Sequence, residues 1–306
     1  MRRILQWIGI GLGSLIGLVV LAAAGLYAKS RLEFSTKYNV QVESVSVPTD
    51  GASIARGQHL ATILCEECHA KDLGGTLGWF PPGMLGTIDT PNLTTGKGGL
   101  GSHFTDADFV RVLRHGVKPD GTSVFIMPAG DFYYLSDTDL GDLIAYIRSV
   151  PSVDRQAPEP HVRLSFVGNI LVGAGPLGSG LRAASIDQSN RPPAPPQAGI
   201  TPEYGAYLVR INGCRGCHGQ QLTGAKTPDP SSPLAPNLTP GGELGAWTEA
   251  QFITALHTGV TPSGTQLPAQ FMPWDFKGQM TNDELKAVFA YLKSLPALPT
   301  TTGPAE

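Results

Sequence analysis

The chain has 306 residues, a formal net charge of −3 at pH 7 and a hydrophobic content of 41%. This length suits two domains of ordinary size plus an additional segment. The weakly acidic balance argues against a nucleic-acid partner, because nucleic acids bind strongly basic surfaces. The 38 glycines and 26 prolines indicate domains that are rich in loops.

A long apolar segment opens the chain. Residues 4–28 carry no charge and follow Arg2 and Arg3. As a helix rising about 1.5 Å per residue, these 25 residues (28 − 4 + 1) would reach about 37 Å, enough for the ~30 Å hydrocarbon core of a bilayer. We expect a transmembrane anchor over residues 1–30 and a stalk over residues 31–50.

A cleavable signal peptide is the alternative for this segment. Residues 22–24 are three alanines, which resemble a cleavage site. Signal peptides, however, have apolar stretches of only ~7–15 residues, which favours the retained anchor. Either alternative carries the rest of the chain across the membrane.

All cysteines of the chain lie in two copies of a Cys-x-x-Cys-His motif, at residues 65–69 and 214–218. This is the spacing at which c-type haem is attached covalently. Two thiols about one helical turn apart can each bond one vinyl-derived arm of the porphyrin, and the adjacent imidazole can bind the iron. The residues concerned are Cys65, Cys68 and His69 in the first copy and Cys214, Cys217 and His218 in the second. We therefore predict two covalently bound haem c groups.

Three other chemistries use paired cysteines. A shared zinc site is disfavoured, because structural zinc pairs lie about 15–20 residues apart and Cys68 and Cys214 are separated by 146 positions (214 − 68). A thioredoxin-like site needs a βαβ context and gives no role to the histidines. Disulfides across two intervening residues seldom stabilise a fold.

The chain beyond the stalk repeats one pattern twice. After each haem motif comes Pro-Asn-Leu-Thr, at 91–94 and 236–239. A helix with capping-box spacing then begins after Thr105 or Thr248, and a glycine, Gly116 or Gly259, ends it. A second capped helix closes each copy, at residues 136–150 and 281–295, and proline stops it.

This repeat defines the expected architecture. The fold is all-α, with the N-terminal transmembrane helix followed by two tandem domains at residues 51–151 and 201–297. A Pro/Gly-rich connector spans residues 152–200 and includes a proline run at 191–196. Residues 298–306 are expected to form a flexible tail.

Both copies contain a Met-Pro pair before the last helix. Met127 follows His69 by 58 positions (127 − 69), and Met272 follows His218 by 54 (272 − 218). A thioether is a soft, neutral ligand that can complete the coordination of haem iron opposite a histidine. We therefore predict Met127 and Met272 as the second axial ligands, beside His69 and His218.

Other candidate ligands do not repeat. Met84 and Met280 have no counterpart in the other copy, which favours ordinary packing. Bis-histidine ligation would need His103, His115, His161 or His257, and none of these is matched across the copies.

Each copy resembles a class I cytochrome c domain, with its haem motif, Pro-x-Leu loop, distal methionine and terminal helix. The whole chain is similar to membrane-anchored dihaem cytochromes c, such as the cytochrome subunits of bacterial membrane-bound alcohol and sugar dehydrogenases. The resemblance covers residues 50–151 and 201–297. It implies that the carbonyls of Pro91 and Pro236 orient His69 and His218.

Three functions are compatible with these features. Two saturated irons favour an electron carrier that relays single electrons between redox proteins, such as a dehydrogenase, an oxidase or another cytochrome. A haem subunit that connects a separate dehydrogenase to the membrane is close to this. A dihaem peroxidase needs an iron with an open position, and a thiosulfate dehydrogenase of this type needs an extra cysteine. We expect a non-catalytic carrier in a bacterial inner membrane, with its haem domains facing the periplasm.

Overall fold

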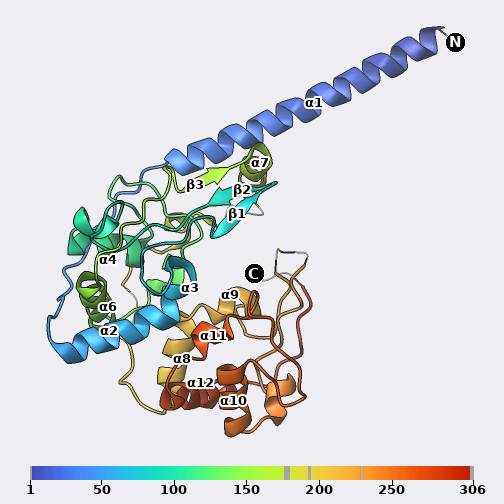
Figure 1. The fold of residues 1–306 in the computed structure, drawn as a ribbon. Helices are drawn as coiled ribbons and strands as arrows, with labels where there is room; N and C mark the ends of the chain where they lie inside the picture. Colours follow the sequence, from blue (N-terminus) through green and yellow to red (C-terminus); the bar gives the residue numbers. More distant parts are fainter. Residues whose placement is uncertain (1, 176–179, 192–193, 228, 230, 304–306) are drawn as a thin grey trace.

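The computed structural model of the protein describes residues 2–175, 180–191, 194–227, 229 and 231–303. A long N-terminal helix projects from a body made of two similarly built helical halves (Figure 1). We call residues 51–151 the first half and residues 201–297 the second half. The first half lies beside the base of the long helix, and the second half lies beyond it.

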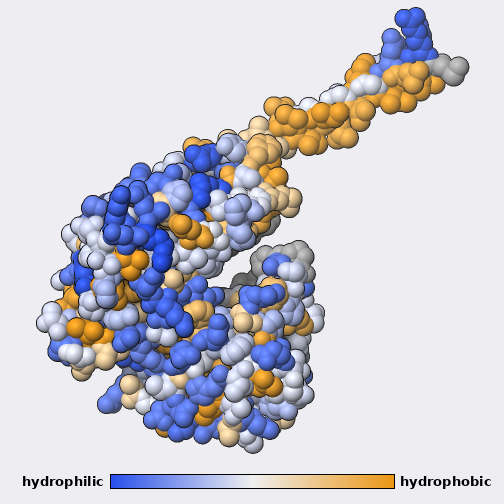
Figure 2. Space-filling view, in the orientation of Figure 1, coloured by the Kyte–Doolittle hydropathy of each residue, from blue (hydrophilic) through white to orange (hydrophobic). Residues whose placement is uncertain are grey.

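Helix α1 spans Arg2–Ser35 and is 34 residues long. It is long and apolar enough to cross a membrane, and its apolar stretch is not buried against the body. Figure 2 shows this stretch as a continuous hydrophobic surface. The helix extends beyond the expected anchor, because nothing between Leu26 and Ser35 breaks it.

The first half contains the expected helices around its haem motif. They are α2 (Gly51–Leu64), α3 (Glu66–His69), α4 (Asp106–His115), α5 (Ala129–Phe132) and α6 (Asp137–Ser149). Gly57 lets α2 pack directly on the backbone of α6, because a Cβ at this position would lie 1.9 Å from the Asp142 carbonyl oxygen. The capping box at Thr105 and the left-handed Gly116 (φ 65°) delimit α4 as the sequence predicts.

The second half repeats this arrangement. Its helices are α8 (Pro202–Ile211), α9 (Cys214–His218), α10 (Glu249–Thr258), α11 (Trp274–Lys277) and α12 (Asn282–Ser294). Gly205 is the counterpart of Gly57, since its Cβ would lie 1.9 Å from the Ala287 carbonyl oxygen. Helix α10 begins at a capping box on Thr248 and ends at Gly259, with φ 71°. Single turns of 3-10 helix lie at η1 (Leu100–Ser102), η3 (Ala183–Ser185) and η4 (Glu243–Ala246).

A small sheet departs from the all-α expectation. Strands β1 (Phe80–Gly83), β2 (Gly86–Ile88) and β3 (Val162–Leu164) form an antiparallel sheet in the order β1-β2-β3. The first two strands belong to a loop of the first half, and β3 comes from the connector. Strands of three or four residues, one containing two prolines, are too short for an alternating pattern to reveal them.

The connector and the stalk both pack on the first half. In the connector, helix α7 (Phe166–Ala174) follows β3 and lies along the base of α1. In the stalk, the Tyr38 amide donates to the Gly121 carbonyl at 2.8 Å, and Val40 is buried. Two residues of the expected proline run, 192–193, lie outside the described residues, as do 304–306 of the tail.

One hydrophobic core runs through both halves. It joins Leu60 and Ile63 of α2 to Leu208 and Ile211 of α8, and all four side chains are almost fully buried. The halves therefore share an apolar interface beside their haem motifs.

Candidate haem-binding sites

The first haem motif lies where α2 turns into α3. Cys65 caps the end of α2 and begins α3, and its carbonyl accepts the His69 amide at 2.9 Å. This single helical turn brings the two cysteines and the histidine onto one short element. Cys65 is buried and Cys68 is half-buried.

The second haem motif forms the single short helix α9. Gly213, in the left-handed conformation at φ 68°, separates it from α8. Cys214 is half-buried and Cys217 is exposed, whereas His218 is buried. The two motifs thus have the same local form, and Cys217 is the more accessible outer thiol.

Both motif histidines are held by a proline carbonyl. The Nδ1 atom of His69 lies 2.9 Å from the Pro91 carbonyl oxygen, and that of His218 lies 2.8 Å from the Pro236 carbonyl oxygen. A carbonyl only accepts, so Nδ1 carries the proton and Nε2 of a neutral ring carries the lone pair. Burial lowers the pKa of both imidazoles, which favours this neutral form.

The remaining ring nitrogen is the one that a metal would use. Within the described part of the chain, no protein group hydrogen-bonds the Nε2 atom of His69 or His218. A neutral imidazole with a fixed Nδ1 proton and a free Nε2 lone pair fits a haem iron. The donor set of each motif is therefore suited to haem c.

The proline loops are fastened by the asparagine that follows each proline. Asn92 accepts the Thr94 amide at 2.9 Å and donates to the Val153 carbonyl at 2.6 Å. Asn237 likewise accepts the Thr239 amide at 2.8 Å and donates to the Leu298 carbonyl at 2.9 Å. This role of the asparagines was not predicted, although the repeated Pro-Asn-Leu-Thr contains its signal.

The four thiols do not have the properties of a redox pair or a zinc site. All four cysteines are free. Burial raises the pKa of Cys65 and Cys68 to about 12 and that of Cys214 to about 11, the opposite of a reactive thioredoxin-type thiol. Among the described residues, no group of three or more His, Cys, Asp or Glu side chains could hold a metal ion.

Met127 and Met272 occupy matching positions. Both are half-buried against the core. The carbonyl of each accepts the amide two residues later, from Ala129 at 2.8 Å and from Trp274 at 2.7 Å, and a single-turn helix follows. The unmatched Met280 is buried in the core, as packing predicts, whereas Met84 is 73% exposed on the β1–β2 hairpin, so the packing prediction is wrong for Met84.

Two of the histidines outside the motifs, His115 and His257, have other partners. His115 binds Glu43 through Nε2 at 2.9 Å and Gln188 through Nδ1 at 2.7 Å. His257 binds the Gly278 carbonyl at 2.6 Å and Asn282 at 2.9 Å. Both ring nitrogens are engaged in each case, so neither imidazole is available to an iron.

The contacts between the halves follow an approximate two-fold pattern. From α2, Arg56 binds Glu284 of α12 at 2.8 Å, and His59 binds the same carboxylate at 2.7 Å. From α8, the Tyr207 hydroxyl donates to Asp139 of α6 at 2.5 Å. The first helix of each half thus reaches the start of the last helix of the other.

The haem motifs follow α2 and α8, so the ends of these two helices bring both motifs to this interface. Lys277 of α11 donates to the Ile63 carbonyl, two residues before Cys65, at 2.7 Å. Its ammonium is near enough to Cys65 and Cys214 to oppose the effect of burial on the pKa of both thiols. Elsewhere at the interface, the Arg210 guanidinium of α8 lies over the Tyr134 ring, 4.0 Å from its centroid. Lys277 therefore lies close to both motifs.

Comparisons with known proteins agree with this geometry. Residues 202–296 match the family model of cytochrome c, and residues 52–147 match that of cytochrome c oxidase, cbb3-type, subunit III. The chain is 30% identical to the fructose dehydrogenase cytochrome subunit of Gluconobacter japonicus, over 80% of this chain and 53% of that protein.

Two further relatives extend the comparison. The cytochrome c subunit of the quinone-type alcohol dehydrogenase of Gluconacetobacter polyoxogenes is 30% identical, over 83% of this chain and 58% of its own length. A diheme cytochrome c-type protein of Cereibacter sphaeroides is 27% identical, over 76% of this chain and 82% of its own length. The chain thus spans little more than half of the dehydrogenase subunits. It belongs to the cytochrome c family, with two cytochrome c domains and two covalently bound haem c groups.

Proposed function

We propose that the protein is a membrane-tethered electron relay, in which two haem sites pass single electrons between redox proteins. The observation that carries this proposal is the pair of matching donor sets at one shared interface. Haem c, when bound, supplies reversible one-electron chemistry at its iron. The chain has to hold each haem, set the ligand geometry and keep the two sites close together.

We assign haem attachment to the four motif cysteines and proximal ligation to His69 and His218. The Pro91 and Pro236 carbonyls orient these rings and fix their Nδ1 protons. Met127 and Met272 would supply the second ligand of each haem, since each lies at the same repeat position beside the core. Two protein ligands for each iron would leave no open position for a substrate, which favours transfer over catalysis.

The shared interface favours transfer between the two sites. Lys277 joins α11, which follows Met272, to the backbone just before Cys65. The second site is thereby connected to the first by one side chain and one hydrogen bond. We infer that electrons cross between the halves here rather than through an external carrier.

We propose a dehydrogenase as the electron donor. Relatives of this chain are named as cytochrome subunits of fructose and alcohol dehydrogenases. A respiratory oxidase or another cytochrome is the corresponding acceptor. The chain itself is non-catalytic in this scheme. It acts either as an electron carrier between separate redox proteins or as a subunit that connects the dehydrogenase to the membrane.

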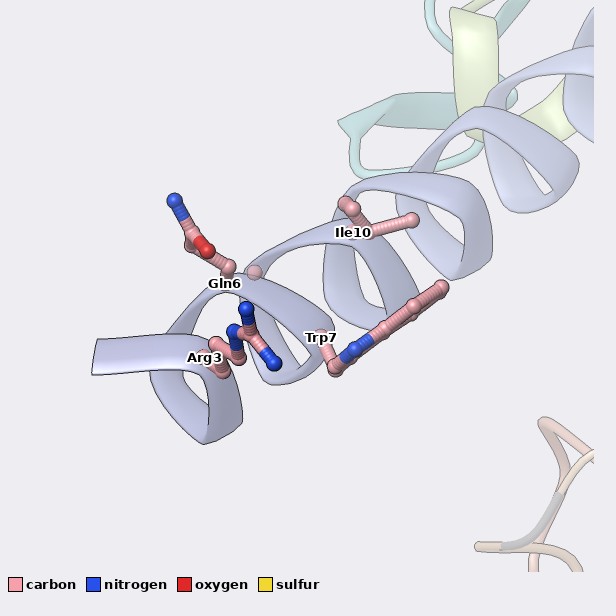
Figure 3. A pocket seen from close by; sticks show the side chains of 5 residues that line it. Arg3, Gln6, Trp7 and Ile10 are labelled. Carbon is pink, nitrogen blue, oxygen red and sulfur yellow. The ribbon is translucent and has the colours of Figure 1, made fainter. Parts of the chain in front are cut away.

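We further propose that α1 is a retained anchor in a bacterial inner membrane and that the haem domains face the periplasm. Figure 3 shows Arg3, Gln6, Trp7 and Ile10 lining a hollow on the outer surface of α1, where polar side chains give way to apolar ones. Trp7 and Tyr27 are 20 positions apart (27 − 7), about 30 Å along a helix. Aromatic residues favour the two membrane boundaries, so this spacing fits one bilayer core.

Membranes that contain or lack the chain test the proposed relay. With a dehydrogenase substrate as reductant, both haems of the chain should reduce within the turnover time of the dehydrogenase, and membranes without the chain should lose electron flow to the acceptor. Purified protein should not turn over peroxide. Haems that stay oxidised while the dehydrogenase turns over, or peroxide turnover by the purified chain, would refute the proposal.

A further inference from the structure

Helix α7 is fastened to the base of α1 by several contacts. Lys29 Nζ donates to the Gly173 carbonyl at 2.8 Å, and the buried Ser30 hydroxyl donates to Asn169 Oδ1 at 3.0 Å. Gly173 permits direct backbone contact, because a Cβ there would lie 2.0 Å from the Leu26 carbonyl oxygen. These contacts fix the height of α7 along α1.

That height is the outer boundary of the proposed membrane span. The rings of Tyr27 and Phe166 stack with their centroids 5.6 Å apart. Tyr27 is the boundary aromatic opposite Trp7, about 30 Å away along the helix. The beginning of α7 therefore lies at the level of the lipid headgroups and the first acyl carbons.

Three exposed side chains beside this contact are apolar. Phe166 is 58% exposed, Val167 is 38% exposed, and Met84 at the tip of the β1–β2 hairpin is 73% exposed. The hairpin tip adjoins α7, because the Ser165 hydroxyl donates to the Met84 carbonyl. In Figure 2 the hydrophobic surface of α1 continues onto the body at the base of the helix, where Figure 1 places α7.

We propose that Met84, Phe166 and Val167 form a second membrane contact, which inserts into the boundary region of the lipid leaflet beside α1. The proposal rests on the proposed anchoring through α1. Lipid is the occupant that the structure favours, since the patch adjoins the apolar anchor and lies at the height of its boundary aromatic. Apolar side chains beside a spanning helix gain free energy from this insertion. The contact would hold the first half, and its haem motif, at a fixed orientation to the membrane.

Lipid cross-linking tests this contact on the full chain with both haems. The protein is placed in phosphatidylcholine nanodiscs that contain a phospholipid with a photoactivatable group near the glycerol end of its acyl chain. After illumination, adducts are mapped by peptide mass spectrometry. We expect adducts on α1, on the hairpin around Met84 and on Phe166 and Val167. Leu234 and Val260, which are exposed apolar residues of the second half at 40% and 37%, should carry none.

Substitutions separate this inference from the anchoring. In the double variant Met84→Glu/Phe166→Glu, the number of lipid adducts on the patch should fall at least five-fold, and the adducts on α1 should remain. The matched variant Leu234→Glu/Val260→Glu should keep both sets. Adducts on α1 without adducts on the patch would overturn this inference alone. That result would also be expected if the patch binds another protein and not lipid. The absence of adducts on α1 would overturn the anchoring as well.

Discussion

The first and second halves surround their haem motifs with the same groups. In each half a proline carbonyl holds the histidine, an asparagine fastens the proline loop, and a Met-Pro turn precedes a short helix. The halves differ in their surroundings, because in the described part of the chain the first half contains the β1–β2 hairpin and lies beside β3, α7 and the base of α1. The groups that hold the haem motifs thus repeat, whereas the elements beside α1 do not. Variants at matching positions test whether the two halves are equivalent.

Loss of the paired thiols should have the largest effect. Cys65→Ser/Cys68→Ser and Cys214→Ser/Cys217→Ser should each lower the covalent haem content from two per chain to one. The remaining motif keeps its own thiols and histidine, so one haem should stay attached. Intact mass and pyridine haemochrome absorbance measure the count. Two covalent haems in either variant would contradict the assignment of the motifs.

The polar contacts between the halves should contribute strongly to stability. Although burial raises it, hydrogen bonds from His59 and Arg56 lower the pKa of Glu284 to about 2, from an ordinary value of 4.5. The stabilisation is therefore present above about pH 4.5 and is lost as the pH falls toward 2. Arg56→Met, which leaves this buried carboxylate without its cation, should lower the free energy of unfolding by about 3 kcal/mol at pH 7.

Thermal unfolding between pH 7 and pH 3 checks this contribution. The wild type should lose stability below pH 4.5, and Glu284→Gln should show a much smaller pH dependence. Glu243→Gln, at an exposed glutamate of the same half, should behave as the wild type, and so should Lys118→Met at an exposed lysine. Equal pH dependence in Glu284→Gln and the wild type would show that this contact does not hold the halves together.

The asparagines of the two proline loops should have equal, smaller effects. Asn92→Ala and Asn237→Ala each remove the donor to a backbone carbonyl and the acceptor for a threonine amide. Each should cost about 2 kcal/mol in the free energy of unfolding. Asn→Asp at either position keeps the acceptor and should cost less than alanine. A large loss in one half only would break the equivalence of the two loops.

The shared lysine should have the smallest effect, and it should act on both halves. Lys277→Met removes a positive charge near both motifs, and a nearby cation favours the reduced iron. Both reduction potentials should fall by roughly tens of millivolts in a spectroelectrochemical titration. Lys277→Arg should preserve them. A shift of one haem alone would place Lys277 in one site instead of between two.

The sequence predicts the repeated parts of this molecule well. Helix starts at Thr105 and Thr248 and ends at Gly116 and Gly259 agree with the structure, because caps and left-handed glycines are local signals. The proline–histidine hydrogen bonds follow from the family resemblance. The contact of Arg56 with Glu284 joins residues 228 positions apart and leaves no local pattern.

Apart from the roles of Asn92 and Asn237 and the contacts between the halves, the features that the sequence does not predict lie outside the repeat. The stalk was expected as a separate segment, yet its valines pack against the first half, since an extended apolar segment beside a helical core buries its side chains. The tail residues 298–303 hydrogen-bond the second half, as when the Thr301 amide donates to the Thr223 carbonyl at 2.9 Å. Backbone pairing of this kind depends on tertiary position more than on residue type.

The far-red methionine–iron charge-transfer band of the oxidised protein tests whether the two iron sites are equivalent. The wild type should show the band with the intensity of two haems, and Met127→Leu and Met272→Leu should each retain the intensity of one. Each variant should also gain one haem that binds carbon monoxide when reduced. A wild-type band equivalent to one haem or none, or a high-spin resting haem, would contradict two matched histidine–methionine sites.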